Sequence, residues 1–280
     1  MKIAYCGYDF FSACLSALIE SGQNVYKVFT FDCDNRFNFN NYIYEICSAN
    51  SIPVSNTPVS DDIINSLAQE GCDVLITAGY RYKIPDLTNT PIKGINIHPT
   101  LLPLGRGVWP VPWTILTQQR KTGITIHKLT SNFDTGDILL RKEFAVDPHE
   151  NLESLSSKLQ MQAVEVLWQL MQDFEEKWQN AKPQEENGSY WSMPSEQDRT
   201  IDWKMNVEEI DRIARAFGKF SCYARFDNKD WYVYDLTAWE EPHSKPLGTV
   251  VHKTNTEMVI AAADGFVCMR YFAENQKDTS

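Results

Sequence analysis

Side chains that can do acyl-transfer chemistry are concentrated in two segments, GINIHPTLLPLGRGVWPVPWTIL from Gly94 and TGITIHKLTSNFDTGDILL from Thr122. Asn96 and His98 are two residues apart, so an extended backbone directs both side chains to the same face. An asparagine N–H can bind an oxyanion, and a histidine can exchange a proton near neutral pH. Such a pair on its own is usually a surface or capping feature, so its meaning depends on what surrounds it.

The second segment adds carboxylates on a glycine-containing turn. Asp134 and Asp137 lie in the run 133–137, and Asp134 follows Asn96 by 38 residues. One of these carboxylates can orient the imidazole and accept a proton directly or through water. The Asp-Thr-Gly run also fits an aspartic protease, but those enzymes need all-β lobes and two carboxylates that share a proton. The elements around this turn do not favour that alternative.

The first 80 residues alternate short apolar strands with helices. We expect strands at 2–7, 24–31, 53–54 and 73–78, and helices at 12–21, 42–49 and 61–69. This alternation predicts an α/β fold with a doubly wound, mostly parallel sheet, in which ligands bind at the carboxyl ends of the strands. The first strand ends at Gly7 without a GxGxxG run, which disfavours a dinucleotide site.

The second half of the chain predicts a smaller domain. A long helix is expected from 152 to about 179, because apolar residues recur at spacings of three and four. We expect a catalytic domain at 1–182, a polar linker at 183–200, and a small β-rich, barrel-like domain at 201–280. The latter begins with a helix at 207–217 and has hairpin turns at 227–230 and 264–265.

Composition excludes several classes of protein. The 26 basic and 37 acidic residues give a net charge of −11, which argues against nucleic acid as a partner. No apolar run approaches the roughly 18–20 residues of a membrane span, and the N-terminus lacks a clear signal-peptide cleavage site. Seven scattered cysteines form no CxxC pair, and five histidines form no HExxH. We therefore expect a cytoplasmic protein with reduced thiols and no metal site.

The blocks between Asn96 and Leu140 resemble those of the N10-formyltetrahydrofolate-dependent formyltransferases. The resemblance covers residues 1 to about 180 and continues more weakly through 201–203 and the helix after it. It implies a Rossmann-like formyltransferase fold, N10-formyltetrahydrofolate as co-substrate and a homodimer. It also implies site residues, with Asn96, His98 and Asp134 in catalysis and the folate held by Arg81, Tyr82, Lys83, Ile84 and Asp137.

The acceptor amine is the open question within this family. The loop FDCDNRFNFNN after the second strand carries one arginine, and residues 190–280 carry 11 basic against 15 acidic residues. We therefore predict a nucleotide-linked amino sugar as the acceptor, with Phe10, Trp109 and Tyr190 as candidate stacking residues. The alternatives are formylation of methionyl-tRNA and a catalytically silent binding module. The run GITIHKL favours a structural, hydrogen-bonded strand histidine at His127 over a catalytic one. Trp113 is open between a core position and a wall for the acceptor.

Overall fold

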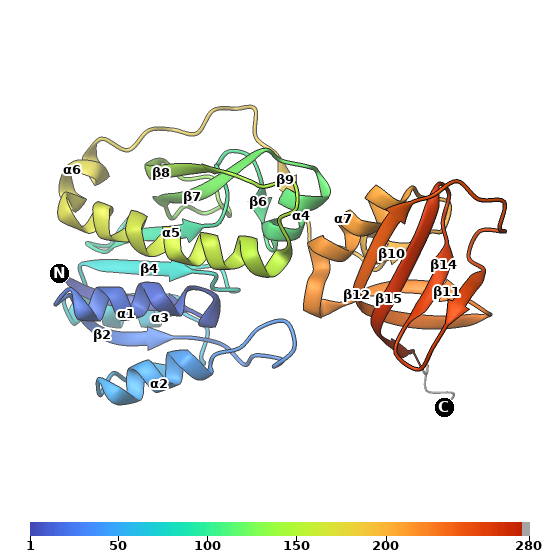
Figure 1. Ribbon diagram of the computed structural model, residues 1–280. Coiled ribbons are helices and arrows are strands. Elements are labelled where there is room, and N and C mark those ends of the chain that lie inside the picture. The colour runs from blue at the N-terminus through green and yellow to red at the C-terminus, as the bar shows by residue number, and fades with distance from the viewer. Residues whose placement is uncertain (276–280) are drawn as a thin grey trace. The chain divides into compact units, whose positions relative to one another are not determined.

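The computed structural model describes residues 1–275, which form two compact units (Figure 1). The first unit comprises Met1–Pro110, Lys121–Val146 and Ser156–Ser192. The second comprises Val111–Arg120, Asp147–Leu155 and the chain from Met193 onward. This division agrees with the fold class expected from the sequence, a mixed α/β part followed by a β-rich C-terminal part.

The first unit is built on a seven-stranded sheet with the order β3-β2-β1-β4-β5-β7-β8. The first five strands of the chain pair in parallel, whereas β7 is antiparallel to β5 and β8 is antiparallel to β7. The strands are β1 (Lys2–Gly7), β2 (Asn24–Phe29), β3 (Val54–Ser55), β4 (Val74–Ala78), β5 (Lys93–His98), β7 (Lys121–Lys128) and β8 (Ile138–Ala145). The expected doubly wound, mostly parallel sheet is confirmed.

The helices of this unit begin and end largely where the sequence predicts. They are η1 (Asp9–Phe11), α1 (Ser12–Glu20), α2 (Asn41–Ala49), α3 (Asp61–Gln69), α5 (Leu152–Gln172), whose first residues belong to the second unit, and α6 (Phe174–Gln179). α3 begins after Ser60, whose hydroxyl accepts a hydrogen bond from the Ile63 N–H at 3.4 Å. This cap satisfies one of the N–H groups that a helix start leaves unpaired.

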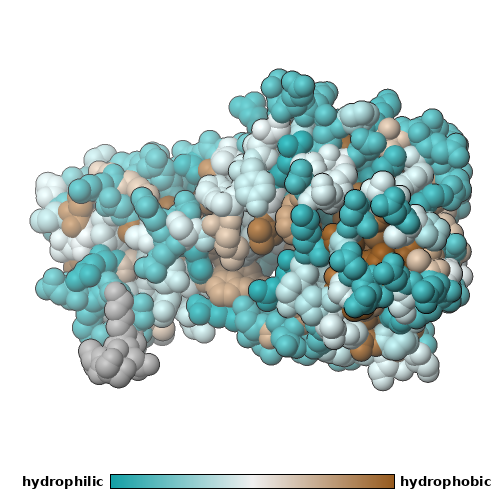
Figure 2. Space-filling model, turned by 180° about the vertical axis from the view of Figure 1, so that it is seen from behind, coloured by the Kyte–Doolittle hydropathy of each residue, from teal (hydrophilic) through white to brown (hydrophobic). Residues whose placement is uncertain are grey.

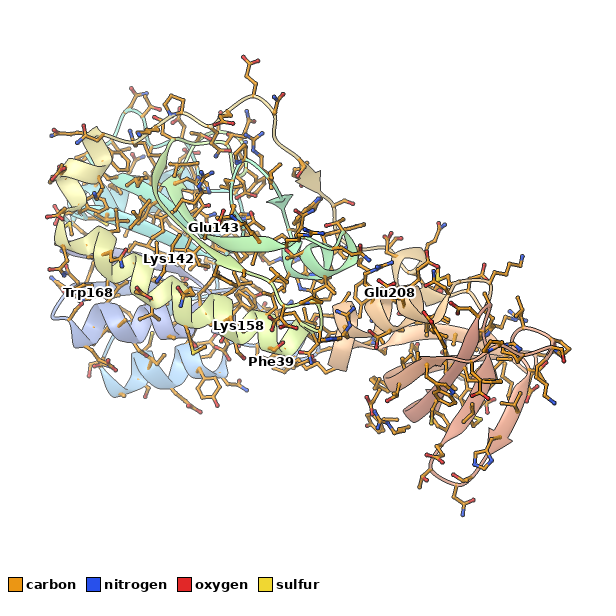
Figure 3. The ribbon with its side chains drawn as sticks, turned by 45° about the horizontal axis from the view of Figure 1, so that its top comes forward. Phe39, Lys142, Glu143, Lys158, Trp168 and Glu208 are labelled. Atoms are coloured by element: carbon orange, nitrogen blue, oxygen red, sulfur yellow. The ribbon has the colours of Figure 1, made fainter. Side chains whose placement is uncertain are left out.

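The expected continuous helix at 152–179 is wrong at one residue. Asp173 leaves the helical conformation with φ −128° and ψ 40°, so α5 ends at Gln172 and α6 begins at Phe174. Aspartate favours such breaks because its short polar side chain competes with helical hydrogen bonding. The break coincides with burial of Phe174, which is only 3% exposed. The predicted apolar stripe of α5 is otherwise buried, and Trp168 projects from the outer side of the helix with 55% exposure (Figure 3).

Strand β5 carries the Asn-x-His pair into the core. Ile95 and Ile97 are 0% and 1% exposed, and the burial of these two side chains fixes the register of β5 in the sheet. The register pairs Asn96 with Thr77 of β4 on one side and with His127 of β7 on the other. Three polar side chains from three strands therefore form one row across the sheet.

The polar segment after α6 also takes part in the first unit. β9 (Tyr190–Trp191) pairs in parallel with β6 (Arg106–Gly107), and Ile138 forms a bridge with Lys182. Residues expected to act as a linker thus make backbone pairs with the loop that follows β5. The first unit extends to Ser192.

The second unit is a six-stranded sheet with the order β10-β11-β12-β15-β14-β13. Its elements are α4 (Pro110–Leu116), η2 (Gln197–Arg199), β10 (Thr200–Ile201), α7 (Val207–Phe217), η3 (Gly218–Phe220), β11 (Cys222–Phe226), β12 (Lys229–Glu240), β13 (Val250–Lys253), β14 (Met258–Ala261) and β15 (Gly265–Glu274). Asn206 and Glu209 form a capping box at α7. Asp227 and Asn228 make the predicted hairpin turn with φ of 49° and 57°.

No helix within residues 1–275 combines the length and the apolar character needed to cross a membrane. Hydrophilic side chains cover most of the face seen in Figure 2, and the hydrophobic ones on it lie in small groups.

The burial of Ile97 generates a stability prediction. Ile97→Ala removes buried methyl and methylene groups between Asn96 and His98, so it should lower the free energy of unfolding by about 2–5 kcal/mol. Urea denaturation followed by circular dichroism measures the change. The control Val108→Ala alters a side chain that is 73% exposed and should stay within about 0.5 kcal/mol of the parent. Equal midpoints for the two variants would contradict this role of Ile97.

Candidate active site

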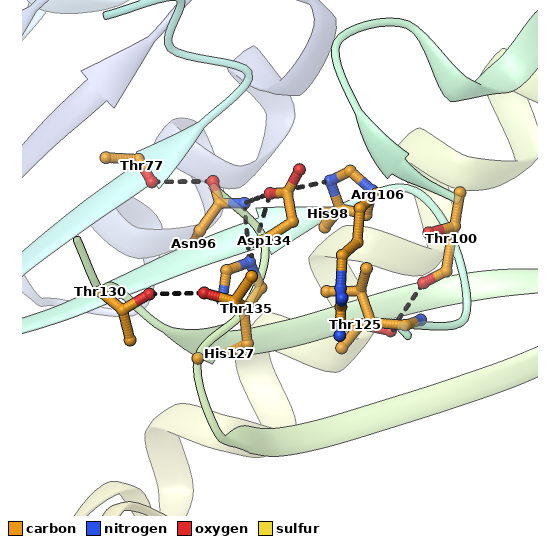
Figure 4. Close-up of polar contacts among 12 residues, drawn as sticks. Thr77, Asn96, His98, Thr100, Arg106, Thr125, His127, Thr130, Asp134 and Thr135 are labelled. Carbon is orange, nitrogen blue, oxygen red and sulfur yellow. Dashed lines mark hydrogen bonds and ion pairs between the residues drawn. The ribbon is translucent and has the colours of Figure 1, made fainter. Parts of the chain in front are cut away.

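Two strands and one loop bring four polar side chains together in the first unit (Figure 4). Asn96 and His98 come from β5, His127 comes from β7, and Asp134 comes from the loop between β7 and β8. His98, His127 and Asp134 are 4%, 2% and 8% exposed. The sequence-predicted trio is thus assembled, and His127 joins it.

Asn96 is oriented by a neighbour that the sequence analysis did not identify. The Thr77 hydroxyl donates to Asn96 Oδ1 at 2.8 Å, which fixes the oxygen end of the amide. Asn96 Nδ2 therefore faces His127 Nε2 at 3.1 Å and Asp134 Oδ1 at 3.3 Å. The amide N–H groups point into the cluster, where they can bind an oxygen that carries negative charge.

The hydrogen bonds of His98 show which of its ring nitrogens carries the proton. Nε2 lies 2.8 Å from the Gly105 carbonyl oxygen, which can only accept, so Nε2 carries the proton in this contact. Nδ1 lies 3.4 Å from Asp134 Oδ1. Burial lowers the pKa of His98, and the Asp134 carboxylate and the Gly105 carbonyl offset only part of that effect. The imidazole is therefore neutral at pH 7, with Nδ1 able to accept a proton next to a carboxylate.

His127 lies inside the cluster rather than in a separate part of the core. Its Nδ1 is 2.8 Å from the Lys128 carbonyl oxygen, so Nδ1 carries the proton and Nε2 accepts from Asn96. Nε2 is also 3.6 Å from Asp134 Oδ1. His127 could be placed in the cluster only by knowing that the strand at 122–128 pairs with the strand at 93–98. The local pattern GITIHKL does not specify that pairing.

Asp134 is a buried, ionised carboxylate. Its burial alone would raise the pKa, but His98, His127 and the Gly107 N–H favour the charged form and together lower it to about 2. The Gly107 N–H donates to Oδ2 at 2.9 Å, while Oδ1 faces both histidines and Asn96. Asp134 has a φ of 56°, a left-handed conformation that aspartate adopts more readily than most residues.

The loop after β5 is shaped to meet this carboxylate. Gly105 and Gly107 have φ of 73° and 121°, and a Cβ at Gly107 would collide with the Trp191 carbonyl oxygen. Glycine is therefore required where the Gly107 N–H approaches Asp134. Gln184 and Ser189 also contact the loops that carry the cluster, and neither was identified from the sequence.

The predicted folate-holding residues follow β4 directly. The guanidinium carbon Cζ of Arg81 lies 5.5 Å from the ring centroids of Phe31 and Tyr82. Ile84 is buried, with 7% exposure. Lys83 is exposed. Because Thr77 at the end of β4 bonds to Asn96, this loop begins next to the strand position that orients the site amide. Asp137 Oδ2 lies 3.6 Å from Lys128 Nζ.

The three predicted stacking residues have different surroundings. Phe10 packs against Tyr8 and Phe11, with centroids 6.2 and 4.7 Å away. Trp109 meets the edge of Phe37 at 6.1 Å. Tyr190 is 62% exposed on β9 and has the freest ring of the three. Trp113 lies in α4, within the second unit.

The His, Cys, Asp and Glu side chains of residues 1–275 do not form a metal site. No group of three or more His, Cys, Asp and Glu side chains is arranged there to hold a metal ion. All seven cysteines are free, and five of them are buried.

Family profiles match most of the chain. One described as "Formyl transferase" matches residues 2–171, and one described as "Formyl transferase, C-terminal domain" matches residues 194–280. The methionyl-tRNA formyltransferase of Treponema denticola is 38% identical over 58% of this chain, and the match spans 52% of that relative, about half its length. The methionyl-tRNA formyltransferase of Marinobacter nauticus is 28% identical over 95% of this chain and 89% of its own length.

Solved structures with the same fold include larger and similar-sized proteins. HypX from Aquifex aeolicus in complex with tetrahydrofolic acid has a TM-score of 0.71 at 20% identity, covering 99% of this chain and 45% of HypX. An N-formyltransferase from Helicobacter canadensis in complex with folinic acid and dTDP-3-aminofucose has a TM-score of 0.74 at 16% identity. That match covers 98% of this chain and 100% of the other.

The contact between Asp134 and His98 predicts how the imidazole titrates. The carboxylate favours the imidazolium, so its removal in Asp134→Asn should lower the pKa of His98 further. Two-dimensional ¹H–¹⁵N NMR of the histidine rings across pH 4–8 measures the shift. Spectra of the parent protein recorded at the same pH values are the control. A His98 pKa that rises in the variant would contradict the proposed coupling.

Proposed function

The chain belongs to the formyl transferase family, and from this we propose that it moves a formyl group from N10-formyltetrahydrofolate to the amine of a nucleotide-linked amino sugar. The observation that carries the reaction type is the convergence of Asn96, His98 and Asp134, with contacts of 3.3 and 3.4 Å to the same carboxylate oxygen. The choice of acceptor rests on the charge of the chain and is argued separately.

The first step is attack of the amine nitrogen on the formyl carbon. A C–N bond forms, and the carbonyl oxygen acquires negative charge in a tetrahedral intermediate. Asn96 supplies an amide N–H donor from a side chain whose orientation is fixed by the Thr77 hydroxyl, and the developing oxyanion replaces His127 or Asp134 as the acceptor of one of its N–H groups. The amide is preoriented because Thr77 and Asn96 are partners in the sheet register.

The second requirement is a path for the proton that the amine loses. His98 is neutral and its Nδ1 carries no proton, so it can accept one while Asp134 stabilises the imidazolium. Collapse of the intermediate breaks the bond to N10, and the held proton passes to that nitrogen. The products are the N-formylated sugar and tetrahydrofolate, and no covalent enzyme intermediate is required.

We assign folate binding to the segment Arg81, Tyr82, Lys83 and Ile84, together with the loop that ends at Asp137. The cationic and aromatic side chains after β4 suit a flat, anionic ligand. On the other loop, Thr130 Oγ1 and Thr135 Oγ1 lie 2.9 Å apart and tie its two ends together (Figure 4). This loop also carries Asp134, so a ligand held against it would lie near the carboxylate.

The acceptor assignment follows from electrostatics. The carboxylate of Asp34 accepts hydrogen bonds from the N–H groups of Arg36, Phe37 and Asn38, so the loop after β2 is a compact turn that carries a single arginine. A chain of net charge −11 gives little attraction to the phosphates of a tRNA acceptor stem. A nucleotide sugar needs far fewer cations, and Trp109 and Tyr190 offer rings for its base.

Methionyl-tRNA is the second candidate acceptor. The relatives from Treponema denticola and Marinobacter nauticus are both methionyl-tRNA formyltransferases, and the first is 38% identical over 58% of this chain. This similarity favours methionyl-tRNA. The two candidates share the same formyl donor and the same site residues. They differ in the phosphate contacts that they require, so salt dependence separates them.

The acceptor prediction is tested by release of tetrahydrofolate from 10-formyltetrahydrofolate. With dTDP- and UDP-linked 4-amino-4,6-dideoxy sugars as acceptors, we expect turnover that changes little between 50 and 200 mM salt. Methionyl-tRNA should give no turnover above the background of uncharged tRNA. Turnover with methionyl-tRNA alone would refute the sugar assignment and leave the reaction type intact, whereas no turnover with either acceptor would favour the silent module.

The catalytic assignment predicts the size of two losses. His98→Ala should reduce kcat by about 10²–10⁴-fold, because a positioned base is lost. Asn96→Ala should reduce it by about 10²–10³-fold, because an oxyanion donor is lost. The exposed His252→Ala is the matched control and should retain full activity. A loss below tenfold for His98→Ala would contradict the mechanism.

The same assignment predicts a pH profile. The neutral form of His98 accepts the proton, so kcat at saturating acceptor should fall as pH drops through the pKa of His98, whereas kcat/KM also contains the ionisation of the free acceptor amine. Because burial lowers that pKa, the acid limb should lie below pH of about 6.5. Initial rates across pH 4.5–9 measure the limb, and an acid limb above pH 7 would contradict a lowered histidine pKa.

A further inference from the structure

The segment 184–191, named here the strap, joins the two loops that carry the active-site groups. We propose that Gln184 and Ser189 are positioning residues for formyl transfer, which hold the loop around Gly105–Gly107 against the loop around Asp134. This inference rests on the proposed function, and it assigns a catalytic purpose to a polar stretch that otherwise resembles a linker. Its experiments include measurements that do not depend on turnover.

The Gln184 side chain makes contacts with both loops. Its Nε2 donates to the carbonyl oxygens of Asp134 and Gly136 at 2.8 and 2.9 Å. Its Oε1 accepts from Arg106 Nε and Nη2 at 3.1 and 2.7 Å. A primary amide has two donor hydrogens and an oxygen with two lone pairs, so all four of its hydrogen-bonding positions are used here.

Ser189 holds the first loop from the other end of the strap. Its hydroxyl accepts from the Gly105 N–H at 2.8 Å, and its carbonyl oxygen accepts from the Arg106 N–H at 3.0 Å. Its own N–H donates to the Pro103 carbonyl oxygen at 3.1 Å. The β6–β9 pairing continues this contact along the chain.

These contacts act on the atoms that define the proton acceptor. The carbonyl oxygen of Gly105 holds His98 Nε2, and the N–H of Gly107 holds Asp134 Oδ2. Gly105 and Gly107 flank Arg106, and Asp134 is the residue whose carbonyl oxygen Gln184 holds. The strap therefore controls the distance between His98 Nδ1 and the Asp134 carboxylate without touching either group's reactive atoms.

Asp134 needs such support because of its backbone. A residue other than glycine with a φ of 56° is held in a sparsely populated conformation, which persists only when its surroundings specify it. The carbonyl oxygens on either side of Thr135, those of Asp134 and Gly136, both accept from Gln184. One side chain thus fixes the turn at the point where the carboxylate leaves the loop.

Loss of the strap's hydrogen bonds should change the pKa of His98. If the Asp134 carboxylate shifts away from His98 while the site stays closed to water, it stabilises the imidazolium less, so the pKa of His98 falls. A displacement of about 1 Å in such a site can reduce the rate by about 10²-fold. A residue that only supports folding would lower stability and leave both the titration and the rate per folded molecule unchanged.

The decisive variant is Gln184→Met, which keeps the length of the side chain and removes its hydrogen bonds. We expect kcat to fall about 10–100-fold with KM changed less than about threefold, and the acid limb of kcat at saturating acceptor to move to lower pH. The matched control Glu185→Gln alters the exposed neighbouring residue of the strap and should behave as the parent. Thermal unfolding of both variants corrects the rates for the folded fraction.

A second pair of variants tests the other end of the strap. Ser189→Ala removes the acceptor for the Gly105 N–H and should reduce kcat, whereas Ser189→Thr keeps a hydroxyl and should restore at least half of that loss on a logarithmic scale. NMR titration of His98 in Gln184→Met should give a pKa below that of the parent. This measurement needs no acceptor, so it tests the strap even if the assigned substrate is wrong.

The outcomes that overturn the proposal are distinct from those that overturn the function. Parent-like kcat and an unchanged His98 titration in folded Gln184→Met would overturn it. So would a rate loss accounted for entirely by the unfolded fraction, with no shift of the pH limb. Absence of formyl transfer by the parent protein would refute the proposed function, while a lowered His98 pKa in the variant would still support the strap.

Discussion

The structure of the site depends on the burial of one charge, the Asp134 carboxylate. A buried anion is costly unless hydrogen bonds and opposite charges surround it. The Gly107 N–H and the Asn96 amide donate hydrogen bonds to it, and the two histidines together with the Gly107 N–H lower its pKa to about 2. These partners come from β5, β7 and the loop after β5, so the carboxylate is stable only when the strand register and the loop path are both correct.

The sheet provides one half of that arrangement. Burial of Ile95 and Ile97 fixes the register of β5. Pairing of β5 with β4 and β7 then places Thr77, Asn96 and His127 in a row across the sheet. β7 is antiparallel to β5, so its histidine reaches the same level from the opposite direction. The loops provide the other half, because Gly107 and Asp134 both adopt positive φ and need contacts from outside their own segments.

Sequence patterns predict a helix end or a turn correctly where the contacts that form it lie within a few residues. The Ser60 cap, the capping box at Asn206 and the turn at Asp227 each involve partners within three residues, and all lie where helix or turn signals occur. The continuous helix at 152–179 was wrong because apolar spacing persists through Asp173 while the backbone does not. The pattern around His127 is that of any half-buried strand and favours a structural role, and only its cross-strand partner Asn96 brings it into the cluster.

The sequence by itself determined the class of fold, the Asn-x-His spacing, the Asp-Thr-Gly-Asp turn and the acidic balance of the chain. These properties follow from periods of two and 3.6 residues and from composition, which need no knowledge of distant contacts. Only the tertiary structure decided that Thr77 orients Asn96, that His127 joins Asp134, and that Gln184 joins two loops. Gln184 lies 50 residues from Asp134, and a hydrogen bond over that separation depends on the path of the whole chain between them.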